Sequence, residues 1–201
     1  MNQKERMLKG LPYLANEDGL FEERQRAKEL CYRINNCEPS DFDMRNRYLR
    51  VLLNNSSEKI YIEPPFRCDY GSNIYIGDNF YANYNLTVLD CAKVTIGENV
   101  LIGPNVCITT AGHPIHYLSR RKYEYADEIV IGNNVWIGAN VVINPGVKIG
   151  DNSVIGSGSV VTKDIPSDVV AVGNPCKVLR EITDEDREYY YKDKKFDVTD
   201  Y

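Results

Sequence analysis

The chain has little of what marks a secreted, membrane or nucleic-acid-binding protein. We expect no signal peptide at its opening Met-Asn-Gln-Lys, and its apolar runs are too short to span a membrane. Positive charge is not in excess, because the formal net charge is −5 over 201 residues, a length that suits one domain. We therefore expect a cytoplasmic protein with no nucleic-acid partner and no membrane contact.

Cysteine and histidine are too scattered or too few to form a familiar metal site. The six cysteines show no C-x-x-C spacing, and scattered thiols in a chain without a secretion signal indicate a reduced, cytosolic protein. The two histidines, His113 and His116, lie three residues apart. They could complete a zinc site only with a carboxylate or a thiolate, so we expect no metal requirement.

What the chain does have is a branched aliphatic residue at every sixth position from Ile131 to Val161, and the same period in two earlier runs of apolar residues. This period fits neither an α-helix nor an exposed alternating strand. It is typical of a parallel β-helix, in which three hexapeptides form one triangular coil and stacked coils pair their strands. A β-sandwich with evenly spaced strands would show longer repeats, of roughly 8–12 residues. The in-phase residues are Ile76, Ala82, Val88, Ile96, Ile102, Ile108, Ile131, Ile137, Ile143, Ile149, Ile155 and Val161.

The residues between the aliphatics support the same fold. Gly, Asn and Asp follow many of them and tolerate the tight or left-handed backbone of a corner. Four residues after many of the aliphatics comes a small or branched side chain, which we expect to be partly inward. These positions are Val100, Val106, Val135, Val141, Val147, Ser153 and Ser159.

The period breaks twice, and each break predicts a structural feature. Val88 and Ile96 are eight residues apart, so one corner should bulge. Ile108 and Ile131 are twenty-three residues apart, which is not a multiple of six. We therefore expect an inserted loop over residues 112–128. Long loops on rigid scaffolds tend to be functional, and this one contains both histidines.

The chain divides into three parts. Residues 1–55 lack the period and look helical, with an amphipathic stripe from Leu20 to Ile34 and Ser40 as the expected N-cap of a further helix. They should pack on the open end of the β-helix, which we expect over residues 56–178. In the tail, residues 179–201, Thr183 should cap a short helix from Asp184 to Lys195.

The candidate for chemistry is Gly112-His113-Pro114. An imidazole of near-neutral pKa at the edge of a coil can remove a proton from a hydroxyl. A purely structural loop histidine is the alternative.

Several motifs taken together resemble one family, the galactoside/maltose O-acetyltransferases. They occur in order along nearly the whole chain, from about residue 4 to 182: Tyr13–Ile34, Asn79–Asn85, Gly112–Pro114, Ile131–Gly138, Asn144–Val147, Val161–Pro166 and Gly173–Val178. The resemblance implies a left-handed β-helix, acetyl-CoA as donor, and a homotrimer with active sites between subunits. The alternative in which the protein is not an enzyme is a non-catalytic trimeric scaffold. A β-helical zinc carbonic anhydrase is disfavoured because it needs three histidines per metal ion.

The resemblance also assigns roles to residues. His113 matches the general base, Asn83 an amide near the acceptor and the developing charge, and the backbone N–H of Ala139 an oxyanion donor. The thioester is already activated, so direct transfer needs no acyl-enzyme. The expected acceptor pocket contains Asp69, Asn83, Asp90 and Glu124. The expected coenzyme groove contains Trp136, Ala139, Ser157, Thr162, Lys163, Lys177 and Arg180, with Lys163 in phase with Ser157 and Ala139.

The acceptor is less well specified than the reaction. Carboxylates and amides suit sugar hydroxyls, which both donate and accept hydrogen bonds. However, this chain has Asp69 where the galactoside branch has a serine, so a galactoside is not indicated in particular. An antibiotic or an amino acid is the alternative acceptor.

Overall fold

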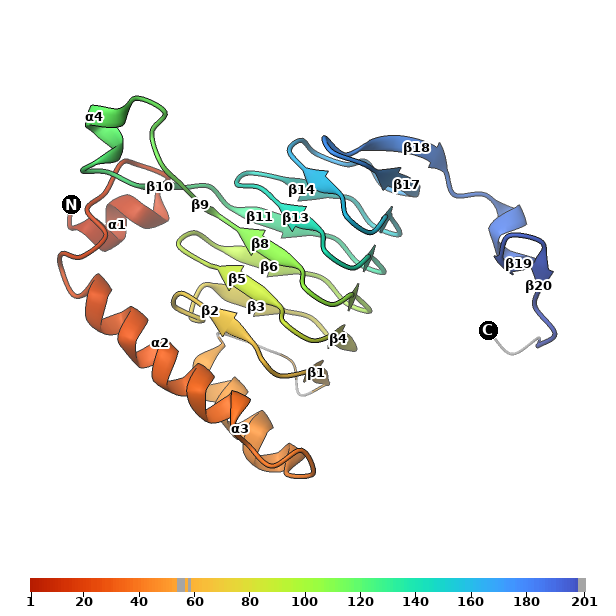
Figure 1. The fold of residues 1–201 in the computed structure, drawn as a ribbon, viewed down its shortest axis with the longest axis horizontal. Coiled ribbons are helices and arrows are strands. Elements are labelled where there is room, and N and C mark those ends of the chain that lie inside the picture. The colour runs from red at the N-terminus through yellow and green to blue at the C-terminus, as the bar shows by residue number, and fades with distance from the viewer. Residues whose placement is uncertain (54–56, 58, 199–201) are drawn as a thin grey trace.

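The computed structural model describes residues 1–53, 57 and 59–198. The strands of this part stack into three sheets that form the sides of a left-handed parallel β-helix, as predicted (Figure 1). We call them the first, second and third sheet, in the order in which the chain visits them within a coil. No helix in the described part of the chain is long and apolar enough to cross a membrane.

Each sheet takes every third strand of the coil. Paired residues are eighteen apart in a regular coil, as with Ile137 and Ile155, and twenty apart where a corner is enlarged, as with Ile62 and Ala82. The first sheet contains β1 (Ile60–Ile62), β4 (Phe80–Ala82), β7 (Leu101–Ile102), β12 (Trp136–Ile137), β15 (Val154–Ile155), β17 (Val169–Val172) and the antiparallel β18 (Lys177–Glu181). The second contains β2 (Arg67–Cys68), β5 (Thr87–Leu89), β8 (Cys107–Thr109), β13 (Val142–Ile143) and β16 (Val160–Val161). The third contains β3 (Ile74–Ile76), β6 (Val94–Ile96), β11 (Ile129–Ile131) and β14 (Lys148–Ile149).

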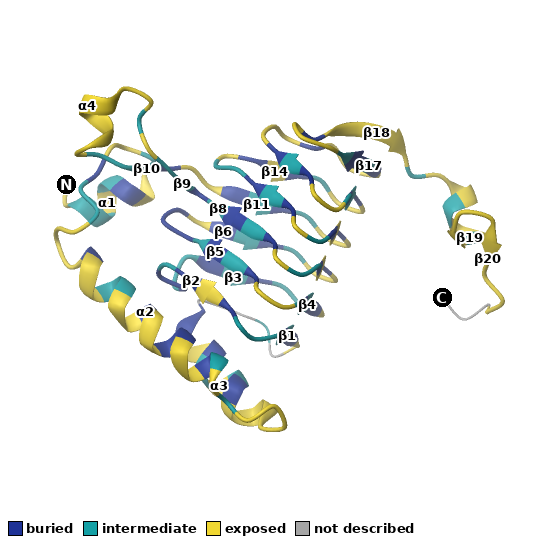
Figure 2. Ribbon diagram, viewed as in Figure 1, coloured by how far each residue is buried: buried dark blue, intermediate teal, exposed yellow. Residues whose placement is uncertain are grey.

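The period of six is explained by the inside of the coil. Ile137 pairs in register with Ile102 on one side and Ile155 on the other, and all three are at most 1% exposed. The small residues four positions later are also buried, between 0% and 2% exposed, rather than only partly inward: Val100, Val106, Val135, Val141, Val147, Ser153 and Ser159. In Figure 2, buried segments recur on the stacked strands of successive coils. Two inward positions per side therefore fill the triangular core.

One corner of the coil is held by an asparagine ladder. Asn99, Asn134 and Asn152 lie between the third and first sheets with φ of 57°, 56° and 60°. Asparagine tolerates this left-handed backbone better than most residues. The side-chain amide of Asn99 donates to Asn134 at 3.1 Å, and that of Asn134 donates to Asn152 at 2.9 Å. The same residue type thus turns the chain and joins successive coils.

The predicted bulge between Val88 and Ile96 is present, and it has a counterpart one coil earlier. Cys68 and Ile76 are also eight residues apart, so the corners that follow β2 and β5 are both enlarged. Asp90 fills the space between them. Its carboxylate accepts backbone N–H groups from Asp69 at 3.1 Å, Tyr70 at 2.9 Å and Asn73 at 3.3 Å.

The N-terminal part is helical, as expected. It contains α1 (Gln3–Leu8), α2 (Leu20–Asn35) and α3 (Phe42–Leu52), and α2 and α3 cover the first coil (Figure 1). The expectation that Ser40 caps α3 was wrong by one residue. Asp41 is the N-cap, because its carboxylate accepts the Met44 N–H at 3.1 Å. The last residues of the predicted segment, 54 and 55, lie outside the described part.

The inserted loop leaves the β-helix after β8. It contains β9 (Ala111–Gly112), α4 (Tyr117–Arg120) and β10 (Tyr125–Ala126), and β9 and β10 pair antiparallel. Beside this pair, Tyr13 and Glu124 exchange backbone hydrogen bonds of 3.0 Å and 3.1 Å. A second apolar cluster, which includes Met7, Tyr13 and Ala126, joins the loop to the N-terminal segment.

The C-terminal helix was predicted wrongly beyond its first turn. Thr183 and Asp186 form a capping box, but only the 3₁₀ turn η1 (Asp184–Arg187) follows. The chain then forms β19 (Tyr189–Tyr191) and β20 (Lys194–Lys195), an antiparallel pair that extends away from the β-helix (Figure 1). Consecutive tyrosines favour strand over helix, which explains the difference.

Candidate active site

The predicted site residues fall into two groups at opposite ends of the second sheet. Its strands are up to three residues long, so the two corners that flank it are separated by on the order of 10 Å. The loop corner, between the second and third sheets, carries Asp69, Asp90, Thr162 and Lys163, together with the loop of His113 and Glu124. The donor corner, between the first and second sheets, carries Asn83, Ala139 and Ser157.

Lys163 holds the same position in its hexapeptide as Ser157 and Ala139, as predicted, but it lies at a different corner. Six residues correspond to one side of the triangle, and eighteen are needed to return to the same corner. Ala139 and Ser157 satisfy that spacing, and the Ala139 N–H donates to Ser157 Oγ at 3.1 Å. Lys163 follows β16 and is exposed at the loop corner.

A pocket of about 280 Å³ opens at the enlarged loop corner. The structure brings Asp69 and Glu124 together there, although they come from the first coil and from the inserted loop. Sequence reasoning did not find the other lining residues, which are Ala15, Asn16, Arg24, Leu89, Cys91 and Ala111. We call this cavity the acceptor pocket, after the acceptor site that the sequence predicts around Asp69 and Glu124.

Arg24 closes the N-terminal side of the acceptor pocket. It stands one turn after Leu20 on the otherwise apolar stripe of α2, which is the signal that could have revealed it. Its Nη1 donates to the Ala15 carbonyl at 2.6 Å and to the Tyr70 hydroxyl at 2.7 Å, and its Nη2 donates to Asn16 Oδ1 at 2.7 Å. Three fixed acceptors orient the guanidinium, as its planar fork allows.

The carboxylate of Asp69 lines the pocket next to the thiol of Cys91. The Cys91 Sγ lies 3.5 Å from Asp69 Oδ2 and donates to it. Burial raises the pKa of Asp69, an effect that the Cys91 hydrogen bond and the Arg24 charge partly offset. Burial and the neighbouring Asp69 carboxylate raise the pKa of the Cys91 thiol. Cys91 is therefore a protonated donor and not a nucleophile.

Asp90 does not line the pocket, which corrects the prediction that it contacts the acceptor. Its side chain is completely buried, and its carboxylate is occupied by three backbone N–H groups. Burial raises the pKa of Asp90 to about 7, although the backbone hydrogen bonds oppose this shift. Because one of those N–H groups belongs to Asp69, Asp90 fixes the backbone from which the pocket carboxylate projects.

Glu124 is held by Tyr13 and not by His113. The Tyr13 hydroxyl donates to Glu124 Oε2 at 2.9 Å, and burial raises the pKa of that hydroxyl. His113 follows β9 on the same loop, and it is exposed. Its imidazole is therefore open to a ligand from outside the chain.

The donor corner carries polar groups, among them the Asn83 side chain and the Ser157 hydroxyl. The side-chain oxygen Oδ1 of Asn83 accepts a hydrogen bond of 2.7 Å from the Tyr84 N–H. A Cβ on Gly138 would lie 2.6 Å from the Ser157 backbone nitrogen, so only glycine lets these coils approach closely. Trp136 stands on β12 of the adjoining first sheet and is 54% exposed, as its outward phase predicts.

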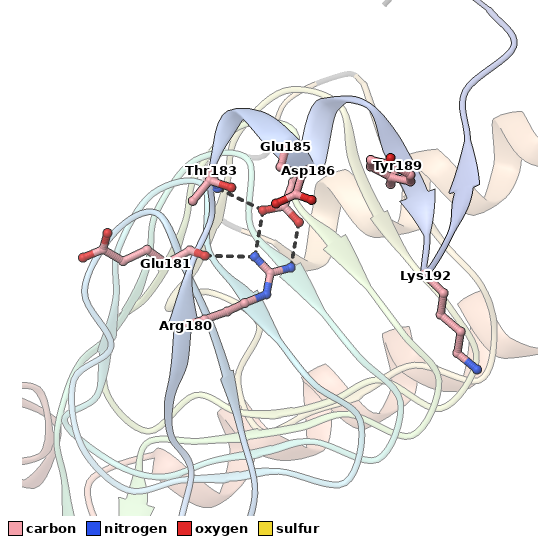
Figure 3. Close-up of a pocket in the computed structure, with 7 residues that line it drawn as sticks. All are labelled: Arg180, Glu181, Thr183, Glu185, Asp186, Tyr189 and Lys192. Carbon is pink, nitrogen blue, oxygen red and sulfur yellow. Dashed lines mark hydrogen bonds and ion pairs between the residues drawn. The ribbon is translucent and has the colours of Figure 1, made fainter.

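Two of the predicted phosphate-binding residues lie on β18. Lys177 and Arg180 are both exposed. Arg180 already makes a bidentate ion pair with Asp186, with both nitrogen–oxygen distances at 2.7 Å (Figure 3). The guanidinium hydrogen bonds lower the pKa of Asp186 to about 2. Arg180 would have to share or leave this pair to bind a phosphate.

The described residues contain no group of three or more His, Cys, Asp or Glu side chains placed to hold a metal ion. A left-handed β-helix with a histidine-bearing loop beside a polar pocket defines a class of protein, the hexapeptide-repeat acyltransferases.

Comparison with known proteins shows which family within this class the chain belongs to. The family described as "Maltose acetyltransferase hexapeptide capping motif" matches residues 6–56, and "Bacterial transferase hexapeptide (six repeats)" matches residues 128–163. The chain is 52% identical to the galactoside O-acetyltransferase of Escherichia coli K12 over 97% of both chains. The chain therefore belongs to the galactoside/maltose O-acetyltransferase family, and it is an acetyltransferase.

Solved structures agree with this assignment. A galactoside acetyltransferase in complex with coenzyme A superimposes with a TM-score of 0.96 at 51% identity, covering 98% of this chain and 100% of that one. A maltose O-acetyltransferase from Clostridium difficile 630 gives 0.89 at 48% identity, covering 92% and 99%.

Proposed function

We propose that this chain transfers an acetyl group from acetyl-CoA to a hydroxyl of a sugar or a similar small acceptor, with His113 as general base. The observation that carries the proposal is the acceptor pocket itself. Carboxylates of Asp69 and Glu124 and the oriented guanidinium of Arg24 line one small cavity next to the histidine loop. Such a mixture of acceptors and donors suits hydroxyl groups, which do both.

The transfer is direct. The imidazole of His113 takes the proton of the acceptor hydroxyl, and the hydroxyl oxygen attacks the thioester carbonyl. The carbon–sulfur bond then breaks, and the imidazolium returns its proton to the leaving thiolate of coenzyme A. No cysteine is needed as nucleophile, which fits the raised pKa of the Cys91 thiol in the pocket.

The oxyanion donor is the backbone N–H of Ala139. In the structure this N–H donates to Ser157 Oγ, so the Ser157 hydroxyl must turn away or share the donor during the reaction. A preset donor of this kind is typically worth about 2.7–4 kcal/mol in the transition state. Asn83 lies at the same corner and supplies a side-chain amide beside it.

A complete site requires a second copy of the chain. His113 and Ala139 lie at opposite ends of the second sheet, on the order of 10 Å apart or more, too far to act on one carbonyl. A homotrimer would bring the loop corner of one subunit against the donor corner of the next. The coenzyme would lie in that crevice, contacting Trp136, Ser157, Thr162, Lys163, Lys177 and Arg180 from the two sides.

The test is to incubate the protein with acetyl-CoA and a panel of sugars and to follow release of the free thiol. Transfer should disappear in His113→Ala and persist in the matched control His116→Ala, whose exposed ring stacks on Tyr117 in the same loop. Transfer that survives in His113→Ala would remove the imidazole from its role. No transfer to any acceptor, together with no coenzyme binding, would favour a scaffold. Light scattering tests the trimer.

A further inference from the structure

Two of the six cysteines meet, although they are far apart in the sequence. Cys31 on α2 and Cys68 at the end of β2 place their sulfur atoms 3.7 Å apart. All six cysteines are free thiols, and Cys31 and Cys68 form the one thiol–thiol contact among the described residues. We propose that Cys31 and Cys68 form a reversible disulfide, with a low-molecular-weight disulfide as oxidant, and that this cross-link modifies the acceptor pocket.

The packing places the two thiols for this reaction. They belong to the helix that covers the first coil and to a strand of that coil, so both are held by the core. A disulfide requires the sulfurs to close to about 2.05 Å. That is an approach of roughly 1.6 Å from the present distance, within the reach of side-chain rotation and a small shift of α2.

The two thiols are buried, but a small molecule can reach them through a groove. Cys31 and Cys68 are 6% and 7% exposed, and both line a groove of about 610 Å³ between α2 and the second sheet. Lys28 and Arg67 also line this groove. Their positive charges favour approach of an anionic oxidant such as glutathione disulfide.

The contact also gives the two thiols different pKa values, and this decides which of them attacks the oxidant first. The hydrogen bond from Cys68 lowers the pKa of the Cys31 thiol, and the same hydrogen bond raises the pKa of Cys68. Since the thiolate is the nucleophile in thiol–disulfide exchange, Cys31 attacks first. Its sulfur bonds to one sulfur of the oxidant, and the other half leaves as a thiolate. Cys68 then loses its proton, attacks the mixed disulfide at the Cys31 sulfur, and releases the second thiolate. In total the protein loses two hydrogens and the oxidant becomes two thiols.

The cross-link acts on the acceptor pocket because the two are adjacent. Asp69 follows Cys68 directly, and the groove of the thiol pair and the acceptor pocket share Asp69 and Leu89 as lining residues. Arg24, which also lines the acceptor pocket, stands on the same helix as Cys31. Drawing α2 toward β2 therefore moves Arg24 relative to Asp69 within the pocket. This second part rests on the proposed function, whereas formation of the disulfide does not.

The experiment treats the full-length protein with glutathione disulfide at pH 8 and maps its peptides without reduction. The expected result is a Cys31–Cys68 linked peptide and an intact mass lower by two hydrogens, both reversed by dithiothreitol. Cys31→Ser and Cys68→Ser should each abolish the link. Cys37→Ser should retain it, because Cys37 lies just beyond the end of α2 and its thiol binds the Arg33 carbonyl instead. Stable glutathione adducts without the 31–68 link would overturn the proposal.

Kinetics test the coupling separately. The oxidised enzyme should show an acceptor KM changed several-fold and an unchanged KM for acetyl-CoA, with Cys31→Ser insensitive to the oxidant. A linked protein with an unchanged acceptor KM would refute the coupling. Absence of transfer in the reduced protein would instead refute the proposed function, and the mass measurement would still decide the disulfide.

Discussion

The hydroxyl of Tyr13 donates a hydrogen bond of 2.9 Å to the carboxylate of Glu124, across 111 residues of sequence. The backbones of the same two residues are also paired. This contact ties the N-terminal segment to the inserted loop at the wall of the acceptor pocket. It explains how a loop that interrupts the repeats can hold a carboxylate in a fixed position.

Tyr13→Phe should destabilise the fold and weaken acceptor binding together. The hydroxyl is buried, so its loss removes a hydrogen bond worth about 0.5–1.5 kcal/mol and leaves Glu124 less well fixed. Urea unfolding and acceptor KM measure the two effects. Tyr32→Phe is the control, because Tyr32 is 70% exposed. Equal stability of both variants would mean that the contact contributes nothing.

Arg24→Lys should raise the acceptor KM by about 10-fold or more while the KM for acetyl-CoA stays constant. Lysine keeps the charge but cannot reach Ala15, Asn16 and Tyr70 at once, and a charged hydrogen bond is worth about 1.5–3 kcal/mol. Initial-rate kinetics with each substrate varied give both constants. Arg26→Lys is the matched control on the exposed side of α2. An acceptor KM unchanged in Arg24→Lys would exclude Arg24 from the pocket's function.

Asp90 should make stability fall as the pH rises from about 4 to about 7. Its folded-state pKa is raised by burial from 3.8 to about 7, so in this window the folded state binds the extra proton. That stabilisation is fully present below the unfolded pKa and is lost as the pH rises through the folded pKa. Urea unfolding of the wild type and Asp90→Asn at several pH values should show a difference that shrinks or reverses toward alkaline pH. A constant difference would contradict the assigned pKa.

Ile137→Ala should cost about 2–5 kcal/mol of unfolding free energy, because it opens a cavity in the central column of the coil. Ile137 is fully buried between Ile102 and Ile155. Denaturant unfolding measures the change. Val51→Ala is the control on the exposed face of α3, where Val51 is 56% exposed, and it should change stability by no more than about 0.5 kcal/mol. Similar losses in both variants would show that the column does not dominate stability.

The β-helix could be predicted because its signal lies within each hexapeptide of the sequence. A hexapeptide places its aliphatic residue inward whatever lies elsewhere in the chain, and a break in the count marks where the chain leaves the coil. Ile131 to Val161 show this directly. The catalytic candidate His113 was found in the same way, since it lies where the repeat stops.

Other features depend on which coils and helices come together. Arg24 reaches the pocket only because α2 covers the first coil, and Asp90 is buried only because two enlarged corners stack around it.

The sequence by itself thus determined the repeating coil, because short-range periodicity dictates which side chains face inward, and its motifs resembled the family that the comparison with known proteins then showed. Only the tertiary structure decided the contacts of the acceptor pocket and the meeting of Cys31 with Cys68. Those contacts join residues distant in sequence, and they are fixed by packing of the N-terminal helices and the loop against the coil, which no local pattern encodes.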